Sequence, residues 1–452
     1  MTDTTTESQP TPVPRPSCGA QQVGDIRRRW WWVEPTVWTA RMLTALETGV
    51  KGGKWFRLID KVYSERNLQS AFWEVWRNDG KPGVDGQTVK QFVQHEQAEL
   101  AKLAAELHAG SYRAHPSRRA WIPKLGSTEK RPLGIPAVRD RVVQAALRHV
   151  LEPIFEREFA EHSYGFRPGR GCKDALRRVD GLLTAGYTWV VDADLKSYFD
   201  SISHERLLER VREHIADGPV LRLIENYLKA GVLEGLRGWQ PSTSGTPQGA
   251  VISPLLANLY LNPLDHTMAQ AGRQMVRYAD DFVILCQTKA EAEAALAGVR
   301  TWVEAVGLRL HPEKIRIVDA TQRGGFDFLG YHFERGRKWP RRKSLKKLRD
   351  RLRGPTRRSS GQSLPVIVAA VNPTLRGWFA YFKHSLPNTF AGVDGWVRMR
   401  LRSILRKRNG GKGRGRGADH QRWPNAYFAT QGLYSLVTAH AELVRQSHVR
   451  PH

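Results

Sequence analysis

The sequence is poor in cysteine and contains no long apolar run. Its three cysteines, Cys18, Cys172 and Cys286, lie far apart and form no Cys-x-x-Cys pair or Cys/His cluster. This spacing excludes a disulfide scaffold and argues against a zinc module. The first residues lack the apolar core of a secretory signal, and the apolar run at 366–371 has about a third of the length of a membrane span. We therefore expect a cytoplasmic protein of a reducing compartment that does not enter a membrane.

Acidic residues are also scarce relative to basic ones. Lysine and arginine number 71, aspartate and glutamate number 44, and the formal net charge is +27. A charge of this sign and size favours binding to a polyanion, and nucleic acid is the commonest polyanion in a cell. The 40% apolar content, with 15 tryptophans, excludes a wholly disordered chain. It is sufficient for about two or three packed domains.

The positive charge is concentrated in three segments. Residues 27–32 read Arg-Arg-Arg-Trp-Trp-Trp, which is either a basic patch beside an aromatic anchor or a nucleic-acid contact with stacking indoles. Residues 335–358 hold thirteen basic residues and one acid, and residues 398–416 hold nine basic residues and no acid. Such blocks favour phosphate binding over a merely solvated surface. The candidate nucleic-acid contacts here are Arg341, Arg342, Lys343, Lys346, Lys347, Arg349, Arg406, Lys407 and Arg408. The Gly-Arg tract that ends the second block is expected to be mobile until bound.

Apolar periodicity predicts an α+β fold. Residues 58–120 have apolar residues at three- and four-residue steps, interrupted by a turn-forming loop at 78–86. Residues 120–335 alternate strand-like runs, such as 189–191 and 282–285, with helical segments such as 207–228. Residues 1–45 are predicted to be a tail that is disordered at its start, because Thr, Pro, Ser and Gln dominate there.

Acidic side chains occur where two of the strand-like runs end. Asp280 and Asp281 lie between two apolar runs that predict a hairpin, and Asp194 ends the run that begins at Trp189. Taken singly, each is equally well an ordinary turn or a polar strand end. Together they suggest that three carboxylates converge at one end of one sheet. Clustered carboxylates repel each other and favour Mg²⁺, and two such ions suit in-line displacement at phosphorus.

An ordered series of motifs resembles one family. Residues 278–281 read Tyr-Ala-Asp-Asp, which is similar to the YxDD box of reverse transcriptases. The other segments, in order, are 121–124, 131–136, 164–168 (Tyr-Gly-Phe-Arg-Pro), 192–194, 244–249 (Ser-Gly-Thr-Pro-Gln-Gly), 253–258, 308–314 and 328–331. The series resembles the reverse transcriptase/maturase proteins encoded by bacterial group II introns. A weaker resemblance to their maturase-specific region continues through 372–378 to about residue 430. With no cysteine after Cys286, the chain is similar to the form that lacks the HNH endonuclease domain.

The resemblance implies a right-hand polymerase architecture. Fingers and palm, with an antiparallel sheet, would occupy residues 46–335, a basic helical thumb 336–430 and a C-terminal tail 431–452. It also implies that Asp194, Asp280 and Asp281 are catalytic and hold two Mg²⁺ ions, for which Mn²⁺ is a possible substitute. The backbone carbonyl of Leu195 would complete the metal ligands.

Further site residues are implied by the same resemblance. Phe199 would be the steric gate that selects deoxynucleotides, Gln248 would contact the new base pair, and Lys124 and Arg131 would neutralise the triphosphate. The respective alternatives are a core aromatic, a turn residue bonded to its own loop, and a polar contact elsewhere on the fingers. Phe166 and Arg167 would touch the template or, equally, form a turn that caps a helix. Arg277 would be a salt-bridge partner within the palm, and Tyr278 would pack under the turn.

The function implied is an RNA-directed DNA polymerase. It would also bind its group II intron RNA as a maturase to aid splicing, and support intron mobility by target-primed reverse transcription. Its partners would be the intron RNA, an RNA template, a DNA primer or target and dNTPs, in a ribonucleoprotein or at the bacterial nucleoid. Two alternatives stay open. One is a domesticated reverse transcriptase in DNA repair or phage defence, and the other is a splicing factor whose polymerase activity is dispensable.

Overall fold

The computed structural model describes residues 25–50, 52–123, 130–235 and 238–449. They form two compact units, and neither is continuous in sequence. The first unit combines residues up to 119 with 134–159 and 204–259, and the second combines 120–133, 160–203 and the chain from 260 onward. The predicted domains are consecutive along the chain, whereas these units are not. No helix in the described ranges is long and apolar enough to cross a membrane.

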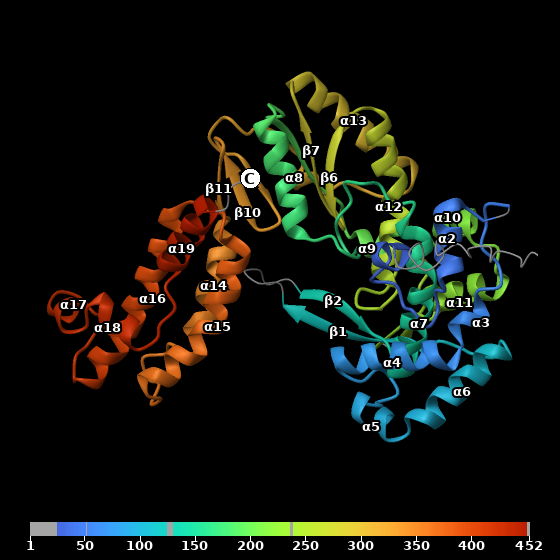
Figure 1. Ribbon diagram of the computed structural model, residues 1–452, viewed down its shortest axis with the longest axis horizontal. Coiled ribbons are helices and arrows are strands. Elements are labelled where there is room, and N and C mark those ends of the chain that lie inside the picture. The colour runs from blue at the N-terminus through green and yellow to red at the C-terminus, as the bar shows by residue number, and fades with distance from the viewer. Residues whose placement is uncertain (1–24, 51, 124–129, 236–237, 450–452) are drawn as a thin grey trace, which may run out of the picture. The chain divides into compact units, whose positions relative to one another are not determined.

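The first unit is mainly helical (Figure 1). Its helices are α2 (Ala40–Thr48), α3 (Ile59–Val62), α4 (Glu65–Asn78), α5 (Val89–Gln94), α6 (Glu96–His108), α7 (Val138–Glu156), α10 (His204–His214) and α11 (Gly218–Lys229). Helix α7 is buried on most of its surface and packs against α3, α4 and α6, which makes it the central helix. The helix predicted at 207–228 is two helices, because Asp217 accepts a hydrogen bond from the Val220 amide and caps the start of α11.

The structure of the N-terminal segment differs from the prediction. Residues 1–45 were expected to be a tail, but the part from residue 25 packs into the first unit, while residues 1–24 lie outside the described residues. Trp38 is fully buried and donates its indole N–H to the carbonyl of His149 at 2.9 Å. Arg29 and Trp30 both donate to the carboxylate of Glu47. The aromatic-anchor interpretation therefore holds for Trp30, while Trp31 stays exposed.

A small sheet and one long helix include residues of both units. The sheet has the order β2-β1-β4-β5. Its strands are β1 (Ser117–Pro123), β2 (Lys130–Ile135), β4 (Val232–Glu234) and β5 (Gly238–Gln240), and the helix is α12 (Ser253–Gln270).

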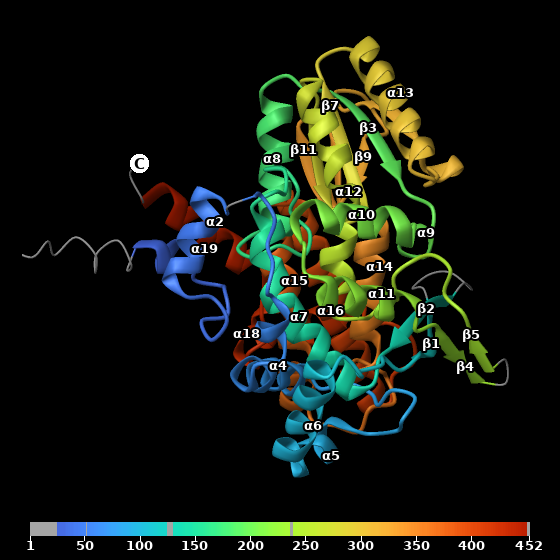
Figure 2. The same ribbon diagram turned by 90° about the vertical axis from the view of Figure 1, so that its right-hand side faces the viewer.

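The second unit is built on an antiparallel sheet with the order β6-β7-β3-β8. Its strands are β3 (Trp189–Asp194), β6 (Gln274–Tyr278), β7 (Asp281–Cys286) and β8 (Arg316–Asp319). Helices α8 (Cys172–Thr184) and α13 (Lys289–Ala305) cover its two faces, as Figure 2 shows. Side chains alternate between these faces, so Val283 and Leu285 pack in the core with α8 while Phe282 and Ile284 are buried on the other side. Because both faces of the sheet are covered, side chains on both faces are apolar, which explains the continuous apolar run at 282–285.

Short elements complete this part of the second unit. A three-stranded sheet has the order β11-β10-β9. These strands are β9 (Phe326–Phe328), β10 (Tyr331–Glu334) and β11 (Arg337–Pro340), and the short helices are α9 (Tyr198–Ser201) and the 3₁₀ helix η2 (Pro312–Lys314). Phe326 and Phe333 stack at 5.0 Å in the same core as α8.

A helical bundle follows β11 in the second unit. It contains α14 (Arg342–Arg353), α15 (Leu364–Phe382), α16 (Pro387–Arg408), α17 (Ala418–Arg422), α18 (Asn425–Thr430) and α19 (Leu436–Val449). The thin apolar stripe expected on the first basic segment is present, because Leu348 and Leu352 are buried in the bundle core. The bundle and the sheet agree with the predicted thumb and palm of a right-hand polymerase.

The structure of the C-terminal segment also differs from the prediction. Residues 431–452 were expected to be a tail, but α19 packs on α16 and α15, and Leu436 lies in the bundle core. The carboxylate of Asp394 accepts hydrogen bonds from the Ser435 hydroxyl at 2.8 Å and from the Leu436 amide at 3.1 Å. This buried carboxylate caps the start of α19 and joins it to α16.

The Gly-Arg tract also differs from its prediction. It was expected to be mobile, but it packs back on α16. The Gly415 amide donates to the Ser403 hydroxyl, and Arg406 donates to the Lys412 carbonyl. A Cβ atom at Gly415 would lie 2.7 Å from that of Arg402, so only glycine allows this close approach.

Candidate active site

Strand register brings the predicted acids together. Asp194, at the end of β3, lies opposite Asp281, at the start of β7. Residues that pair directly in an antiparallel sheet project on the same face, and so do residues two apart in one strand. Asp192, Asp194 and Asp281 therefore share one face, and Asp280 lies in the turn beside them. The expected convergence at one end of the sheet is observed.

Burial and mutual repulsion act on these carboxyls. Burial, together with the charges of Asp192, Asp194 and Asp280, raises the pKa of Asp281 to about 7. Burial also raises the pKa of Asp280 and of Asp192. A cluster with these properties favours the approach of positive charge.

Two basic side chains of the protein supply positive charge next to these carboxylates. Lys314, in η2, forms an ion pair with Asp194, and Arg316, in β8, forms one with Asp192. No role was predicted from the sequence for Lys314, Arg316 or Asp192. The alternation of β3 gives the signal for Asp192, since it is two residues before Asp194.

The donor set fits divalent cations. Among the described residues, no three His, Cys, Asp or Glu side chains are already arranged around one ion position. The oxygen-only donors of Asp194, Asp280 and Asp281 are nevertheless those that Mg²⁺ prefers. A cation would relieve the repulsion that, together with burial, raises the pKa of Asp280 and of Asp281. Leu195 is buried and bridges to Leu310, which fixes the backbone next to Asp194.

The turn that carries Asp280 is held by a buried ion pair. Arg277 is completely buried, and its guanidinium binds both carboxylate oxygens of Asp265 at 2.5–3.0 Å. The same guanidinium donates to the carbonyl of Ala279 at 2.8 Å. Ala279 has a φ of 59°, which a residue with a side chain rarely adopts. The ion pair predicted for Arg277 is thus present and fixes a strained turn.

A second segment supports the turn from outside the hairpin. The Tyr164 amide donates to the Arg277 carbonyl at 2.8 Å, and the Arg277 amide donates to the His162 carbonyl at 3.0 Å. Gly165 then lies so close that a Cβ atom there would be 2.3 Å from the Ala279 nitrogen. The Tyr-Gly-Phe-Arg-Pro motif is therefore part of the support of the acidic turn.

Replacing Gly165 by Ala should push the turn away from its support. The added Cβ meets backbone atoms that cannot rotate aside, so we expect a loss of about 1–3 kcal/mol in the free energy of unfolding. Primer extension should fall several-fold because Asp280 moves with the turn. Chemical denaturation and a primer-extension assay measure the two effects. Gly181→Ala, on α8 where a Cβ meets nothing within 4 Å, is the matched control, and equal behaviour of the two variants would contradict this account.

Phe166 and Arg167 have different environments. Phe166 is half exposed and lies 6.3 Å from the ring of Tyr278, so it remains available as a template contact. Arg167 is buried and donates to the carbonyls of Ala160 and Ser163 at 2.6 and 2.8 Å. For Arg167 the prediction of a template contact is corrected to the turn-stabilising role, because its guanidinium is engaged by the backbone.

The predicted nucleotide-binding residues are distributed over both units. Arg131 is exposed on β2 in the second unit, and its charge partly offsets the rise in the pKa of Asp280 that burial causes. Phe199 follows Asp194 on α9 and is partly exposed, with its ring 5.5 Å from that of Tyr198. Gln248 belongs to the first unit, where its carbonyl accepts a hydrogen bond from Gly134. Lys124 lies outside the described residues.

A groove of about 980 Å³ lies beside the acidic face within the second unit. Its lining includes Asp281, Arg131 and Gly330, together with Lys343 and Lys347 of α14 and Trp378 of α15. Acid on one wall and exposed basic side chains on another suit a ligand that carries phosphates to the carboxylates.

The basic candidates divide into exposed and engaged side chains. Arg342, Lys343, Lys346, Lys347 and Arg349 are exposed on α14, Arg341 at its start is partly buried, and Lys407 is exposed on α16. By contrast, Arg406 forms an ion pair with Asp419, and Arg408 donates to the carbonyls of Ser360 and Gln362. For Arg406 the nucleic-acid prediction is corrected to a structural contact, because Asp419 and the Lys412 carbonyl occupy its guanidinium.

Comparison with family models gives two matches. Residues 122–333 match the model described as "Reverse transcriptase (RNA-dependent DNA polymerase)". Residues 345–423 match "Group II intron, maturase-specific domain". The first match contains the acidic face, and the second lies within the helical bundle.

Curated relatives agree with these matches. Protein YkfC of Escherichia coli is 38% identical over an alignment of 296 residues, and the match covers 57% of this chain and 76% of YkfC. The group II intron-encoded protein LtrA of Lactococcus lactis is 39% identical over 204 residues, 44% of this chain and 33% of LtrA. A chain in the structure of telomerase from Candida albicans is 14% identical with a TM-score of 0.40, covering 70% of this chain and 64% of that one.

Proposed function

Because the chain belongs to the family of group II intron-encoded reverse transcriptases and maturases, we propose that it extends a DNA primer on an RNA template and binds its parent intron RNA to aid splicing. The single observation that carries the polymerase part is the register that sets Asp194 opposite Asp281 at the edge of a groove with basic walls. The aligned part of LtrA is 33% of its length, so activity over the whole protein is part of the proposal.

The acidic residues would hold the divalent cations of the reaction. We assign Asp194, Asp280, Asp281 and the carbonyl of Leu195 as ligands of two Mg²⁺ ions, which Mn²⁺ could replace. The bound ions would stabilise the attacking and leaving oxygens of an in-line displacement. The ion pair between Lys314 and Asp194 would have to open for Asp194 to take this part.

Other residues would bind and select the incoming nucleotide. Arg131 has the charge and exposure to hold its phosphates, since a guanidinium can bind phosphate oxygens bidentately. Lys124 and Gln248 are proposed for the phosphates and the new base pair on the family resemblance. Phe199, which is partly exposed five residues after Asp194, would exclude a ribose 2′-hydroxyl. Phe166 would contact the template with its exposed ring.

RNA-templated primer extension tests the polymerase proposal. Wild-type protein should incorporate dNTPs on an RNA template in the presence of Mg²⁺, and chelation of the cation or Asp280→Ala should abolish incorporation. Asp60→Asn, an exposed aspartate of the first unit, controls for general loss of charge. Equal incorporation by wild type and Asp280→Ala would dismiss the assignment.

The maturase part rests on the bundle. Its basic helix α14 exposes a row of lysines and arginines, and folded RNA is recognised largely through shape and phosphates. We extend the proposal to target-primed reverse transcription during intron mobility, in which the same RNA-bound protein would use a DNA target as primer. Splicing by Asp280→Ala separates the two activities, because it should persist when synthesis is lost.

Charge reversal on α14 should weaken RNA binding and flatten its dependence on salt. Each phosphate contact contributes about one unit to the slope of log K against log salt, so changing Lys346, Lys347 and Arg349 to Glu should reduce the slope by about three. Filter binding of the intron RNA at several salt concentrations measures this slope. An unchanged slope would remove these side chains from the interface.

A further inference from the structure

A second cavity lies in the first unit, and none of its lining residues belongs to the acidic face. It measures about 330 Å³ and is bounded by residues 31–35, by α4 and by α7. Small-molecule sites span about 300–1,000 Å³, so this cavity belongs to the size class of one small heterocyclic group.

Part of the cavity lining is aromatic. Trp31 lines it with 71% of its surface exposed, and Trp32 lines it beside Trp31. An exposed indole gives a flat surface on which a nucleobase can stack, with a gain that is similar for every base. Arg28, three residues earlier, is exposed as well and carries charge suited to a phosphate.

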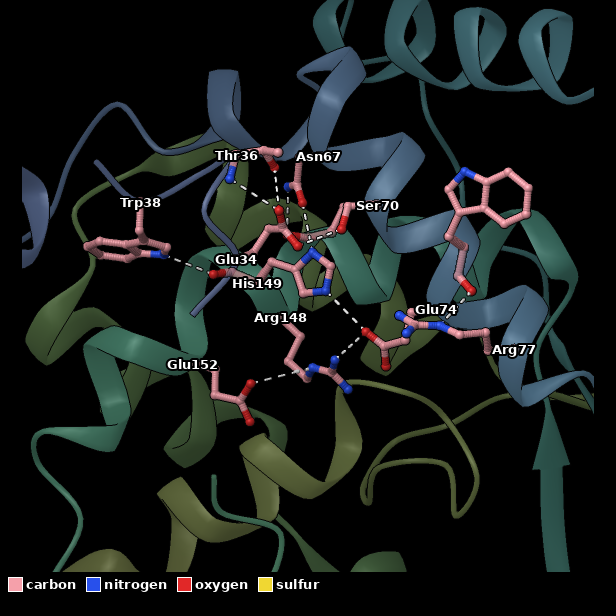
Figure 3. Close-up of polar contacts among 12 residues, drawn as sticks. Glu34, Thr36, Trp38, Asn67, Ser70, Glu74, Arg77, Arg148, His149 and Glu152 are labelled. Carbon is pink, nitrogen blue, oxygen red and sulfur yellow. Dashed lines mark hydrogen bonds and ion pairs between the residues drawn. The ribbon is translucent and has the colours of Figure 1, made fainter. Parts of the chain in front are cut away.

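Another part of the lining is polar, and most of its side chains are held by hydrogen bonds. His149 is held by Asn67 at 2.8 Å and contacts Glu74 at 3.1 Å, and Arg148 binds the same Glu74 carboxylate at 2.6 Å (Figure 3). Glu34 accepts hydrogen bonds from the hydroxyls of Ser70 and Thr36. These contacts leave Glu34, Glu74 and His149 occupied within the protein.

Glu152 and Arg148 are less completely bonded. The contact between the Glu152 carboxylate and Arg148 Nε is 3.6 Å, beyond hydrogen-bond length. Within the described residues, Arg148 Nε is buried without a hydrogen-bond partner. Burial raises the pKa of Glu152 to about 7, which is the signature of a carboxylate short of donors. A carboxylate acceptor and a guanidinium donor thus lie side by side, as Figure 3 shows, and each has bonding capacity left.

We propose that this cavity binds an unstacked guanine base, which stacks on Trp31 and is read by Glu152 and Arg148. Guanine carries two neighbouring N–H donors, at N1 and N2, that a carboxylate accepts together, and its O6 and N7 are acceptors for a guanidinium. Adenine lacks the paired donors and would leave the carboxylate unsatisfied. The base could belong to single-stranded RNA or to a free guanine nucleotide, and both present the same edge.

Binding of short labelled RNAs tests the proposal with the full chain. An oligouridylate with one central guanosine should bind about tenfold more tightly than the same strand with one adenosine. Glu152→Gln should abolish this preference, because its amide N–H₂ faces donors of the base. Trp31→Ala should weaken both strands about tenfold and keep their ratio, since stacking does not depend on the base.

Matched controls and a competitor complete the experiment. Phe56→Ala removes an exposed ring of the same unit that does not line the cavity, and Glu293→Gln removes an exposed carboxylate of α13, and both should behave as wild type. Displacement of the strand by GMP would support a free nucleotide as ligand, and failure of GMP would support a base within RNA. Equal affinity of wild type for the guanosine and adenosine strands, or a preference retained in Glu152→Gln, would overturn the proposal. Asp280→Ala should leave the preference intact, which separates this test from that of the polymerase.

Discussion

Changing Asp281 to Asn is expected to stabilise the cation-free protein while it abolishes DNA synthesis. The pKa of this carboxyl is about 7 in the folded protein, raised by burial and by three neighbouring carboxylates. At pH 8 the charged form therefore opposes folding, by about 1.4 kcal/mol for each pH unit of the shift from its ordinary value. A neutral amide removes most of this penalty, so we expect a gain of a few kcal/mol and a melting temperature several degrees higher.

The pH dependence identifies the cause of the gain. A carboxyl whose pKa is raised on folding binds its proton more tightly in the folded state, so stability falls as pH rises from about 4 to 7 and then levels off. The advantage of Asp281→Asn should therefore be small at pH 4 and full above pH 7. Thermal melts with chelator at several pH values measure it, with Asp60→Asn as control. A constant difference across this range, or a variant less stable than wild type at pH 8, would contradict the account.

Replacing Arg277 by Met should destabilise the protein strongly. Removing one partner of a buried ion pair leaves the other as an uncompensated charge, which costs about 3–5 kcal/mol. Asp265 is buried and its carboxylate receives three hydrogen bonds from this guanidinium. Chemical denaturation of the single variant measures the loss.

The double variant Arg277→Met with Asp265→Leu separates stability from activity. Two apolar side chains can replace a buried ion pair at little cost, so much of the stability should return. Primer extension should remain low, because the hydrogen bond from the guanidinium to the Ala279 carbonyl is not restored. A double variant with wild-type synthesis would show that this hydrogen bond does not position Asp280.

Local patterns predicted the acidic hairpin well. The strand at 189–194 and the turn between Tyr278 and Asp281 depend on neighbours in sequence, and the structure has both. The ends of the chain were predicted as tails, which was wrong for 25–45 and for most of 431–452. Trp38 is held by the His149 carbonyl, and α19 by Asp394, and partners so distant in sequence leave no local periodicity to detect.

The site was predicted less completely than the hairpin. Aspartates at strand ends could be recognised, but their cationic partners could not. Lys314 is 120 residues from Asp194, and the pairing of β3 with β8 together with the bridge between Leu195 and Leu310 brings them close. Arg167 shows the opposite error. Its motif suggests a ligand contact, and the tertiary structure assigns its guanidinium to backbone carbonyls.

The cap that Asp394 provides for α19 limits how far the chain can be shortened from its C-terminal end. A chain shortened to the end of the maturase-specific match, at residue 423, would lose Phe428 and Leu436 from the bundle core. It would also leave the Asp394 carboxylate buried without the Ser435 hydroxyl and the Leu436 amide that satisfy it. The smallest segment that can be expressed as a stable bundle therefore extends well past the boundary that family comparison suggests.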